Sequence, residues 1–333
     1  MTKPNLTAAE LSQLWGSYQN DTLVICVLHY FLQHVRDEEI RAVLSNTLEI
    51  SEARIPQLKK FFQDESHPTP KGFNLKEDVN LSADQLFTDP YMLFYTQQIG
   101  VLGLNAFSMA IPLSARKDIY DFYSSCLTEA NEIHRQSTEL LLEKGLYIRP
   151  PTIPAQEKVD FVKSSNFLQG FFGERRPLLS LEITNLFANI QRNELGVMTL
   201  LGFRQAVESE DIREFMKEGK EIASKHAEVF GSILREEDLP VPVTSDIGVT
   251  KSTEAPFSDK LMMFHVTALI GLGIGYYGAS MSTSPRRDLA THYTRFIGEI
   301  GKYSEKGAKI MIKHGWMEEP PRAVDRDELA KKK

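Results

Sequence analysis

The sequence contains an internal repeat that spans most of its length. Residues 10–70 align without a gap to residues 182–242, and residues 87–151 align to residues 257–321 at a shift that is two residues shorter. About a quarter of the positions in the first block are identical. A repeat this long indicates two tandem copies of one structural unit, related by duplication. The identical pairs include Glu10 and Glu182, Phe31 and Phe203, Arg116 and Arg286, and Glu129 and Glu299.

Each copy predicts four long helices. In the first copy, apolar residues recur at helical spacing over four stretches, which begin near Thr7, Asp37, Asp89 and Ser114. Thr7 with a glutamate three residues later is a capping-box pattern, and Gly145 with prolines beyond it ends the fourth stretch. The second copy repeats these signals. We therefore predict an all-α fold of two tandem four-helix bundles.

The loop between the second and third helices of each copy is about 20 residues long, more than antiparallel neighbours need. A loop of this length can run along a whole bundle, so it favours an up-down-down-up order with one long crossover, as in ferritin-like folds. We expect a first bundle at residues 1–151, a linker at 152–177 that packs on the bundles, and a second bundle at 178–333. The linker aromatics behind that expectation are Phe161, Phe167, Phe171 and Phe172.

Composition and charge exclude several classes of protein. A chain that is 42% hydrophobic and 25% charged is globular, and its net charge of −7 argues against a nucleic-acid partner. Two cysteines, Cys26 and Cys126, do not make a disulfide framework, and both lie on or beside apolar stripes, which predicts buried thiols. Residues 1–7 lack the apolar core of a signal peptide, so we expect a cytoplasmic protein.

The third helix of each copy is almost free of charge. Residues 91–113 contain no charged side chain, and residues 261–283 contain only a histidine. Both stretches are long enough to span a bilayer. However, the other helices are amphipathic, and the centre of a large bundle needs a helix that is apolar all round. We therefore expect no membrane partner.

One glycine motif inside the last of these helices resembles a dinucleotide-binding pattern. Gly273-Ile-Gly275-Tyr-Tyr-Gly278 lies within a helix, whereas the dinucleotide fingerprint needs a strand before it and a helix opening after it. We interpret the small residues Gly271, Gly275 and Ala279 as positions where a neighbouring helix approaches closely.

Candidate metal ligands lie mainly in the second copy. No Glu-x-x-His motif occurs, which argues against an oxygen-activating di-iron centre. Glu194, His226 and Glu299 lie on or beside the inward stripes of three helices at comparable depth, and this set suits a single ion of iron, zinc or manganese. A buried Glu-His ion pair explains the same residues. In an up-down-up-down bundle, His265 comes nearer His226 instead.

The first copy offers a weaker candidate. His29 and His134 both face inward at a similar level, and they either share a metal or form a hydrogen-bonded pair in the core. No Gly-x-Ser-x-Gly elbow occurs, and neither cysteine lies in an electropositive setting. The sequence thus favours a protein that is not an enzyme.

Several segments of the chain resemble one known family. These are Leu-Thr-Ala-Ala-Glu at 6–10, Gly-Leu-Tyr-Ile-Arg-Pro-Pro at 145–151, Lys-Val-Asp-Phe at 158–161, Gly-Phe-Phe-Gly at 170–173 and Pro-Phe-Ser-Asp-Lys-Leu-Met-Met-Phe-His at 256–265. With them the chain resembles the family called domain of unknown function 3231 over nearly its whole length. The resemblance implies an origin in spore-forming bacteria, two ferritin-like bundles and a link with spore-coat proteins. It implies no catalytic residue, and it places His226 and His265 in stretches typical of the family.

Three functions remain open from the sequence. The first is a non-catalytic helical scaffold or interaction protein, associated with sporulation or the spore coat, whose partner is a second copy of the chain or a spore-coat protein. The second is a ferritin-like protein that binds one metal ion in the second copy. The third is a binder of an apolar ligand between helices, which the aromatic content of the third helices and Tyr276-Tyr277 suggest.

Overall fold

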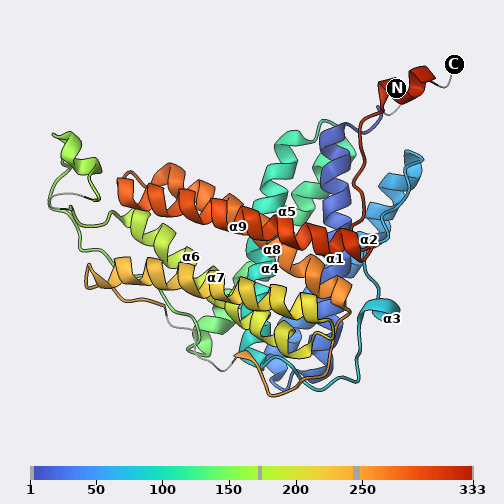
Figure 1. Ribbon diagram of the computed structural model, residues 1–333, viewed down its shortest axis with the longest axis horizontal. Helices are drawn as coiled ribbons and strands as arrows, with labels where there is room; N and C mark the ends of the chain where they lie inside the picture. The colour runs from blue at the N-terminus through green and yellow to red at the C-terminus, as the bar shows by residue number, and fades with distance from the viewer. Residues whose placement is uncertain (1–3, 172–174, 243–247, 332–333) are drawn as a thin grey trace.

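The computed structural model describes residues 4–171, 175–242 and 248–331, and these residues form two four-helix bundles (Figure 1). The first bundle contains α1 (Ala8–His34), α2 (Glu38–Asp64), α4 (Asp89–Ala110) and α5 (Lys117–Glu143). The second contains α6 (Ser180–Ala206), α7 (Glu210–Arg235), α8 (Asp259–Thr283) and α9 (Arg287–Lys313). The short helices are α3 (Leu75–Asp78), α10 (Arg326–Lys331), η1 (Ile111–Leu113) and η2 (Ser165–Leu168). The predicted all-α fold with two tandem bundles is confirmed.

The helices begin and end where the local sequence predicts. The Thr7 hydroxyl accepts the Glu10 amide at 3.2 Å, and the Glu10 carboxylate accepts the Thr7 amide at 2.8 Å, so the capping box is present. The side chain of Asp37 caps α2 in the same way, through the amides of its first turn. Gly145 and Gly315 follow α5 and α9 with φ of 67° and 70°, a backbone region that favours glycine.

The crossover between α2 and α4 runs back along α1. The amide of Phe73 donates to the Thr22 hydroxyl at 3.2 Å, near the middle of α1, and the amide of Leu86 donates to the Tyr30 hydroxyl at 2.9 Å. Asp89, the first residue of α4, then accepts amides just beyond the end of α1. Consequently α4 runs antiparallel to α1 and parallel to α2, which is the predicted up-down-down-up order.

The two crossovers pair with one another. The amide of Asn80 donates to the Pro256 carbonyl at 2.9 Å, and the amide of Thr250 donates to the Leu86 carbonyl at 2.9 Å. These bonds are equivalent under the 170-residue shift that relates the repeats. A second equivalent pair of bonds joins Thr88 to Gly248 and Ser258 to Asp78. Reciprocal contacts of this kind are the signature of a two-fold interface, so the repeats associate as the subunits of a symmetric dimer do.

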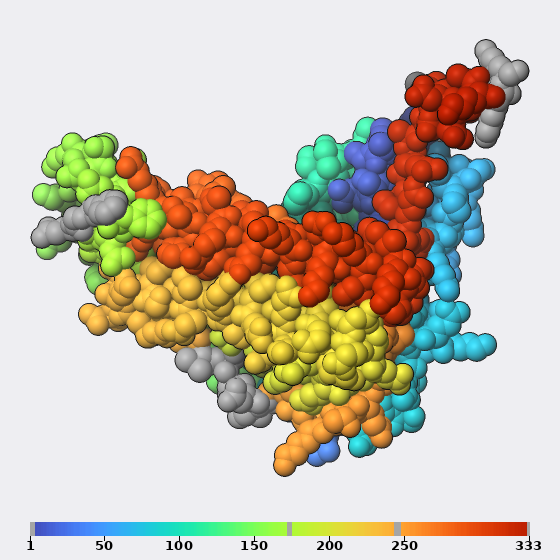
Figure 2. Space-filling view, viewed as in Figure 1, coloured from blue at the N-terminus to red at the C-terminus, as the bar shows by residue number. Residues whose placement is uncertain are grey.

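One hydrophobic cluster runs through both bundles, and a second cluster lies within the first bundle. Across the interface, the rings of Tyr30 and Phe257 lie 5.2 Å apart and those of Phe87 and Phe203 lie 6.0 Å apart. The two bundles lie crosswise in Figure 1, and the surface in Figure 2 has a notch between α9 and the upper part of the first bundle. The shared cluster thus joins the two repeats through direct side-chain contacts.

A buried arginine links several helix ends at one end of each bundle, in a group of contacts that we call the corner network. The guanidinium of Arg116 contacts Glu65 at 2.5 Å and Asp118 at 2.8 Å, and the Glu10 carboxylate accepts the Arg116 amide at 2.8 Å. The second bundle repeats this network with Arg286, Glu237, Asp288 and Glu182. Burial alone would raise the pKa of the Glu10 and Glu182 carboxyls, but the hydrogen bonds they accept hold both values below the ordinary range.

The segment between the bundles is more exposed than the sequence suggests. Phe161 is 79% exposed and Phe171 is 55% exposed, so the predicted packing of the linker is wrong at these two positions. Phe167 does pack, because the guanidinium of Arg176 lies 4.2 Å above its ring. Phe172 and Gly173 lie outside the described residues, and the boundaries at 151 and 178 stay a prediction.

The glycines of α8 do not serve close helix packing. Gly271 and Gly275 are exposed, a Cβ added at either would meet nothing within 4 Å, and Ala279 is exposed as well. The predicted close approach at these positions is therefore wrong. It occurs instead on α4, where a Cβ added at Gly100 would lie 2.7 Å from the backbone of His134.

Among the described residues, α8 is the one helix long and apolar enough to meet the criteria for a membrane span. The central helix of a bundle meets the same criteria. In this structure α8 packs within the second bundle against α6 and α9.

Candidate functional site

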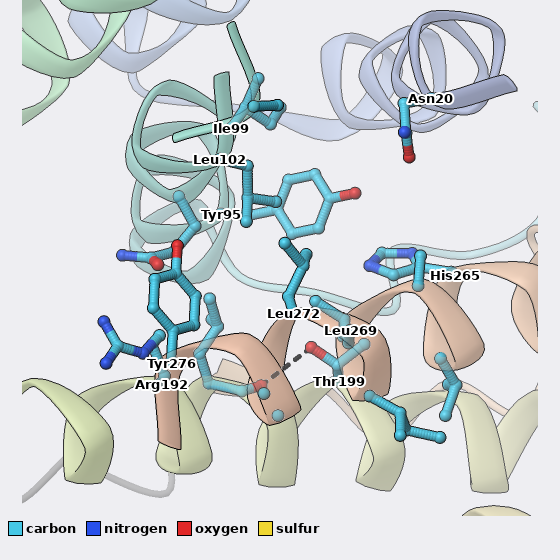
Figure 3. A pocket seen from close by; sticks show the side chains of 18 of the residues that line it. Asn20, Tyr95, Ile99, Leu102, Arg192, Thr199, His265, Leu269, Leu272 and Tyr276 are labelled. Carbon is cyan, nitrogen blue, oxygen red and sulfur yellow. Dashed lines mark hydrogen bonds between the residues drawn. The ribbon is translucent and has the colours of Figure 1, made fainter. Parts of the chain in front are cut away.

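A cavity of about 350 Å³, partly open to solvent, lies between the two bundles, and all eight long helices contribute to its wall (Figure 3). Most of the lining side chains are leucine, isoleucine, valine, alanine or aromatic residues. Ligand pockets in proteins typically measure about 300–1,000 Å³, and an apolar cavity of about 150 Å³ already binds benzene. The cavity is therefore large enough for a small organic molecule.

The wall of the cavity is built from equivalent residues of the two repeats. The equivalent lining pairs are Asn20 and Arg192, Tyr95 and His265, Ile99 and Leu269, Leu102 and Leu272, and Ala106 and Tyr276. Because each pair contributes one residue from either bundle, the cavity lies where the two-fold relation brings the third helices together. Figure 3 shows the side chains from α4 and α8 meeting in its middle.

One face of α8 forms a continuous strip of this wall. His265, Leu269, Leu272 and Tyr276 follow one another at intervals of three or four residues. From the first to the last, the helix rises by roughly 16 Å. The strip gives the cavity an elongated shape, with leucines between two polar side chains.

His265 lies in the cavity wall between aromatic rings. Its ring centroid is 5.4 Å from that of Tyr95 and 5.4 Å from that of Phe203. Among the described residues its Nδ1 atom has no hydrogen-bond partner. Burial lowers the pKa of His265 to about 4, so the imidazole is neutral at pH 7.

Arg192 and Tyr276 form a polar group elsewhere on the wall. The guanidinium carbon of Arg192 lies 3.8 Å from the centroid of the Tyr276 ring, and Asn189 accepts one of its N–H groups at 2.9 Å. The Tyr276 hydroxyl accepts a hydrogen bond from Asn105 of the first bundle at 3.2 Å. Burial lowers the pKa of Arg192, but a guanidinium stays protonated at neutral pH.

The centre of the second bundle holds a hydrogen-bonded chain that borders the cavity. Nε2 of His226 lies 2.9 Å from Glu299, and its Nδ1 lies 3.0 Å from the Tyr277 hydroxyl. Asn193 donates to that hydroxyl at 2.8 Å, and Lys225 also contacts Glu299. Burial lowers the pKa of His226, so a neutral ring donates from Nε2 to the carboxylate and accepts at Nδ1 from Tyr277.

The first bundle has a different cluster at the equivalent positions. Arg54 replaces the histidine and contacts Glu129 at 2.8 Å and Asp21 at 3.4 Å, and its guanidinium lies 4.9 Å from the Phe107 ring. Under the repeat alignment, these four residues correspond to His226, Glu299, Asn193 and Tyr277. The apolar stripes of the sequence do not single out Arg54 or Asp21, although the repeat alignment places them at the positions of His226 and Asn193.

The structure brings together two of the four metal ligands predicted in the second copy. His226 and Glu299 are in contact, Glu194 is half-buried on α6, and His265 lies against aromatic rings in the cavity wall. No group of three His, Cys, Asp or Glu side chains among the described residues has a geometry for a metal ion. Two protein ligands are fewer than zinc or iron sites use, so these residues do not fit such a site, and the metal hypothesis stays a prediction.

The two candidate histidines of the first copy bind different neighbours. His29 contacts Glu52 of α2 at 3.1 Å, and His134 contacts Thr138 of its own helix at 3.5 Å. Each ring thus has a local partner, and the structure shows no bond between the two histidines. Cys26 and Cys126 are buried free thiols, as the sequence predicts.

Comparison with known proteins places the chain in a family. No curated protein matches it. A solved structure described as a "putative spore coat protein" from Bacillus halodurans C-125 is 19% identical with a TM-score of 0.42, covering 46% of this chain and 98% of that one. The model of the family described as "Protein of unknown function (DUF3231)" matches residues 1–159 and again residues 166–329. The chain belongs to this DUF3231 family and carries two copies of its unit.

Proposed function

We propose that this protein is a non-catalytic binding protein that holds an apolar small molecule in the cavity between its two bundles. The observation that carries the proposal is the cavity itself, about 350 Å³ in volume and lined mainly by apolar side chains. The proposal develops the third function that the sequence left open, because Tyr276 and Tyr277 line this cavity.

The half-buried apolar side chains of the wall support a bound ligand. Ile99, Leu102, Leu269 and Leu272 all line the cavity and are all partly accessible to solvent. An apolar molecule that covers them removes apolar surface from water, which contributes about 25 cal/mol for each Å² buried. Such a ligand would also stabilise the folded protein, because it binds the folded state alone.

The polar clusters of the two bundles do not require a catalytic role. His226 contacts Glu299, and Arg54 contacts Glu129 and Asp21, so each has partners within its own bundle. Three other expectations from the sequence stay predictions, and the cavity does not bear on them. They are a scaffold role, association with a spore coat or with a second copy of the chain, and a cytoplasmic location.

A neutral fluorescent probe tests the proposal. N-phenyl-1-naphthylamine carries no charge and brightens in apolar surroundings. Titrated into the full-length protein, it should bind at one saturable site per chain. Leu102→Trp places a bulky side chain in the cavity and should weaken binding at least about tenfold, which corresponds to about 1.4 kcal/mol.

The control is Met109→Trp, on the same helix at a position 65% exposed, which should leave binding unchanged. If Leu102→Trp disturbs the helix content measured by circular dichroism, the milder Leu269→Phe replaces it. Absence of saturable binding, or equal binding by the cavity variant and the control, would overturn the proposal.

A further inference from the structure

We propose that the ligand of this cavity is an amphiphile with one hydrocarbon chain and an anionic head group, and that the head group binds Arg192 beside Tyr276. A fatty-acid carboxylate is the simplest member of the class. This inference rests on the binding function proposed above and names the chemistry of its ligand.

The first argument is that Arg192 has no carboxylate partner among the described residues. Three other guanidinium groups inside the bundles each contact two carboxylates: Arg54, Arg116 and Arg286. Arg192 has instead one hydrogen bond to Asn189 and the face of the Tyr276 ring. A half-buried guanidinium without a counter-ion is costly, and its planar fork of donors matches an incoming carboxylate.

The second argument is the divergence of the two repeats at this position. Duplication makes Asn20 the equivalent of Arg192 and Ala106 the equivalent of Tyr276, and all four line the cavity. At this position the repeats have thus placed a cation in only one bundle, and the arginine that the first bundle contributes elsewhere in the wall, Arg54, already contacts Asp21 and Glu129. A symmetric apolar ligand gains nothing from that difference, whereas a ligand with one anionic head gains a charge-assisted hydrogen bond at one end.

The third argument is the character of the wall between the polar positions. Leu269 and Leu272 separate His265 from Tyr276 along α8, and Ile99 and Leu102 face them from α4 (Figure 3). His265 and Tyr276 lie roughly 16 Å apart along the helix, and these leucine and isoleucine side chains form the wall between them. This wall suits a hydrocarbon chain, which gains about 0.8 kcal/mol for each methylene group it buries.

Competition between two matched ligands tests the inference. Dodecanoate and dodecan-1-ol share one chain and differ in head group. Each would compete with N-phenyl-1-naphthylamine at pH 8, dodecanoate below its critical micelle concentration and dodecan-1-ol below its solubility limit. Wild-type protein should bind dodecanoate at least about tenfold more tightly than dodecan-1-ol. Acetate, which has the head without the chain, should not displace the probe.

Two variants assign the preference to one side chain. Arg192→Gln should retain probe binding and bind both ligands alike. Arg204→Gln removes the same charge from the same helix at a position outside the cavity, and it should keep the wild-type preference. Equal binding of the two ligands by wild-type protein, or a preference that survives Arg192→Gln, would overturn the inference while leaving the binding function intact. Failure of the neutral probe to bind would instead overturn the binding function.

Discussion

Arg54 and His226 occupy the same position in the two repeats, and each bonds to the equivalent glutamate on the fourth helix of its bundle. Arg54 contacts Glu129 at 2.8 Å, and His226 contacts Glu299 at 2.9 Å. The duplicated bundles have therefore kept a polar centre while changing its chemistry. In the first bundle it is an ion cluster that includes a buried aspartate, and in the second it is a neutral histidine between a carboxylate and a tyrosine.

We predict that Arg54→Met strongly destabilises the protein. The substitution leaves the buried Asp21 carboxylate and Glu129 without their cation, and loss of one partner of a buried ion pair costs about 3–5 kcal/mol. The free energy of unfolding in urea measures the effect. Arg135→Met removes an arginine that also contacts two carboxylates but is half exposed, and it should cost no more than about 1 kcal/mol. Similar losses in the two variants would contradict the role given to Arg54.

His226→Ala should cost about 2–4 kcal/mol of unfolding free energy. It removes a ring that stacks on Phe296 at 3.8 Å and that holds hydrogen bonds to Glu299 and Tyr277. Lys225→Ala removes an exposed partner of the same glutamate and should cost less than about 1 kcal/mol. A His226→Ala variant as stable as Lys225→Ala would show that the chain of hydrogen bonds contributes nothing.

The same variant tests the metal hypothesis by elemental analysis. About one equivalent of iron, zinc or manganese in the untagged wild-type protein, absent from His226→Ala, would establish a metal at this position. The structure brings only two of the four predicted ligands together, which is too few for such a site. We therefore expect the wild-type protein and His226→Ala to have equal metal contents.

His265 should make stability depend on pH. The pKa of His265 is about 4 in the folded protein, and the pKa of an ordinary histidine, as in the unfolded chain, is 6.5. The unfolded chain therefore binds more protons than the folded protein between these two pH values. Stability is therefore complete above about pH 6.5 and falls as the pH drops toward 4, by about 3 kcal/mol. His265→Phe, which keeps an aromatic ring at the site, should lack this part of the loss. A constant difference between the two proteins from pH 7 to pH 4 would contradict the prediction.

The two bundles should unfold together. Their shared core predicts one transition, although each bundle has its own corner network. Glu10→Gln in the first corner and Glu182→Gln in the second should therefore shift the same urea transition, each by about 1–3 kcal/mol. Calorimetry and circular dichroism should report one coincident midpoint. Two separate transitions, each sensitive to one variant, would show that the bundles are independent.

The fold of each repeat is accessible from sequence because its determinants are local. Thr7 with Glu10, Asp37 and Gly145 mark the helix ends, and the long loop after α2 implies a crossover. The relation between the repeats is not local. Periodicity shows that α4 and α8 are apolar, but only the pairing of the crossovers reveals that these two helices face one another.

The same limit explains which site residues the sequence approach identifies. His226 and Glu299 are conspicuous because both lie near inward stripes, and they do meet. Glu194 and His265 follow the same pattern, yet neither joins them, because a stripe fixes the face of a helix and not the partner across it. Arg192 is inconspicuous in sequence, since an arginine in an amphipathic helix normally reaches solvent. Its significance comes from the missing carboxylate and from its divergence from Asn20.

The most direct test of the central claim is the position of a bound ligand in a crystal. We would crystallise the protein with 12-bromododecanoate and locate the bromine by anomalous scattering. We predict one bromine site per chain inside the cavity, toward His265 and Leu269 at the far end of the α8 strip, with the carboxylate at Arg192. A saturated crystal with no bromine in the cavity, or with bromine only on the outer surface, would contradict the claim that the space between the bundles is a binding site.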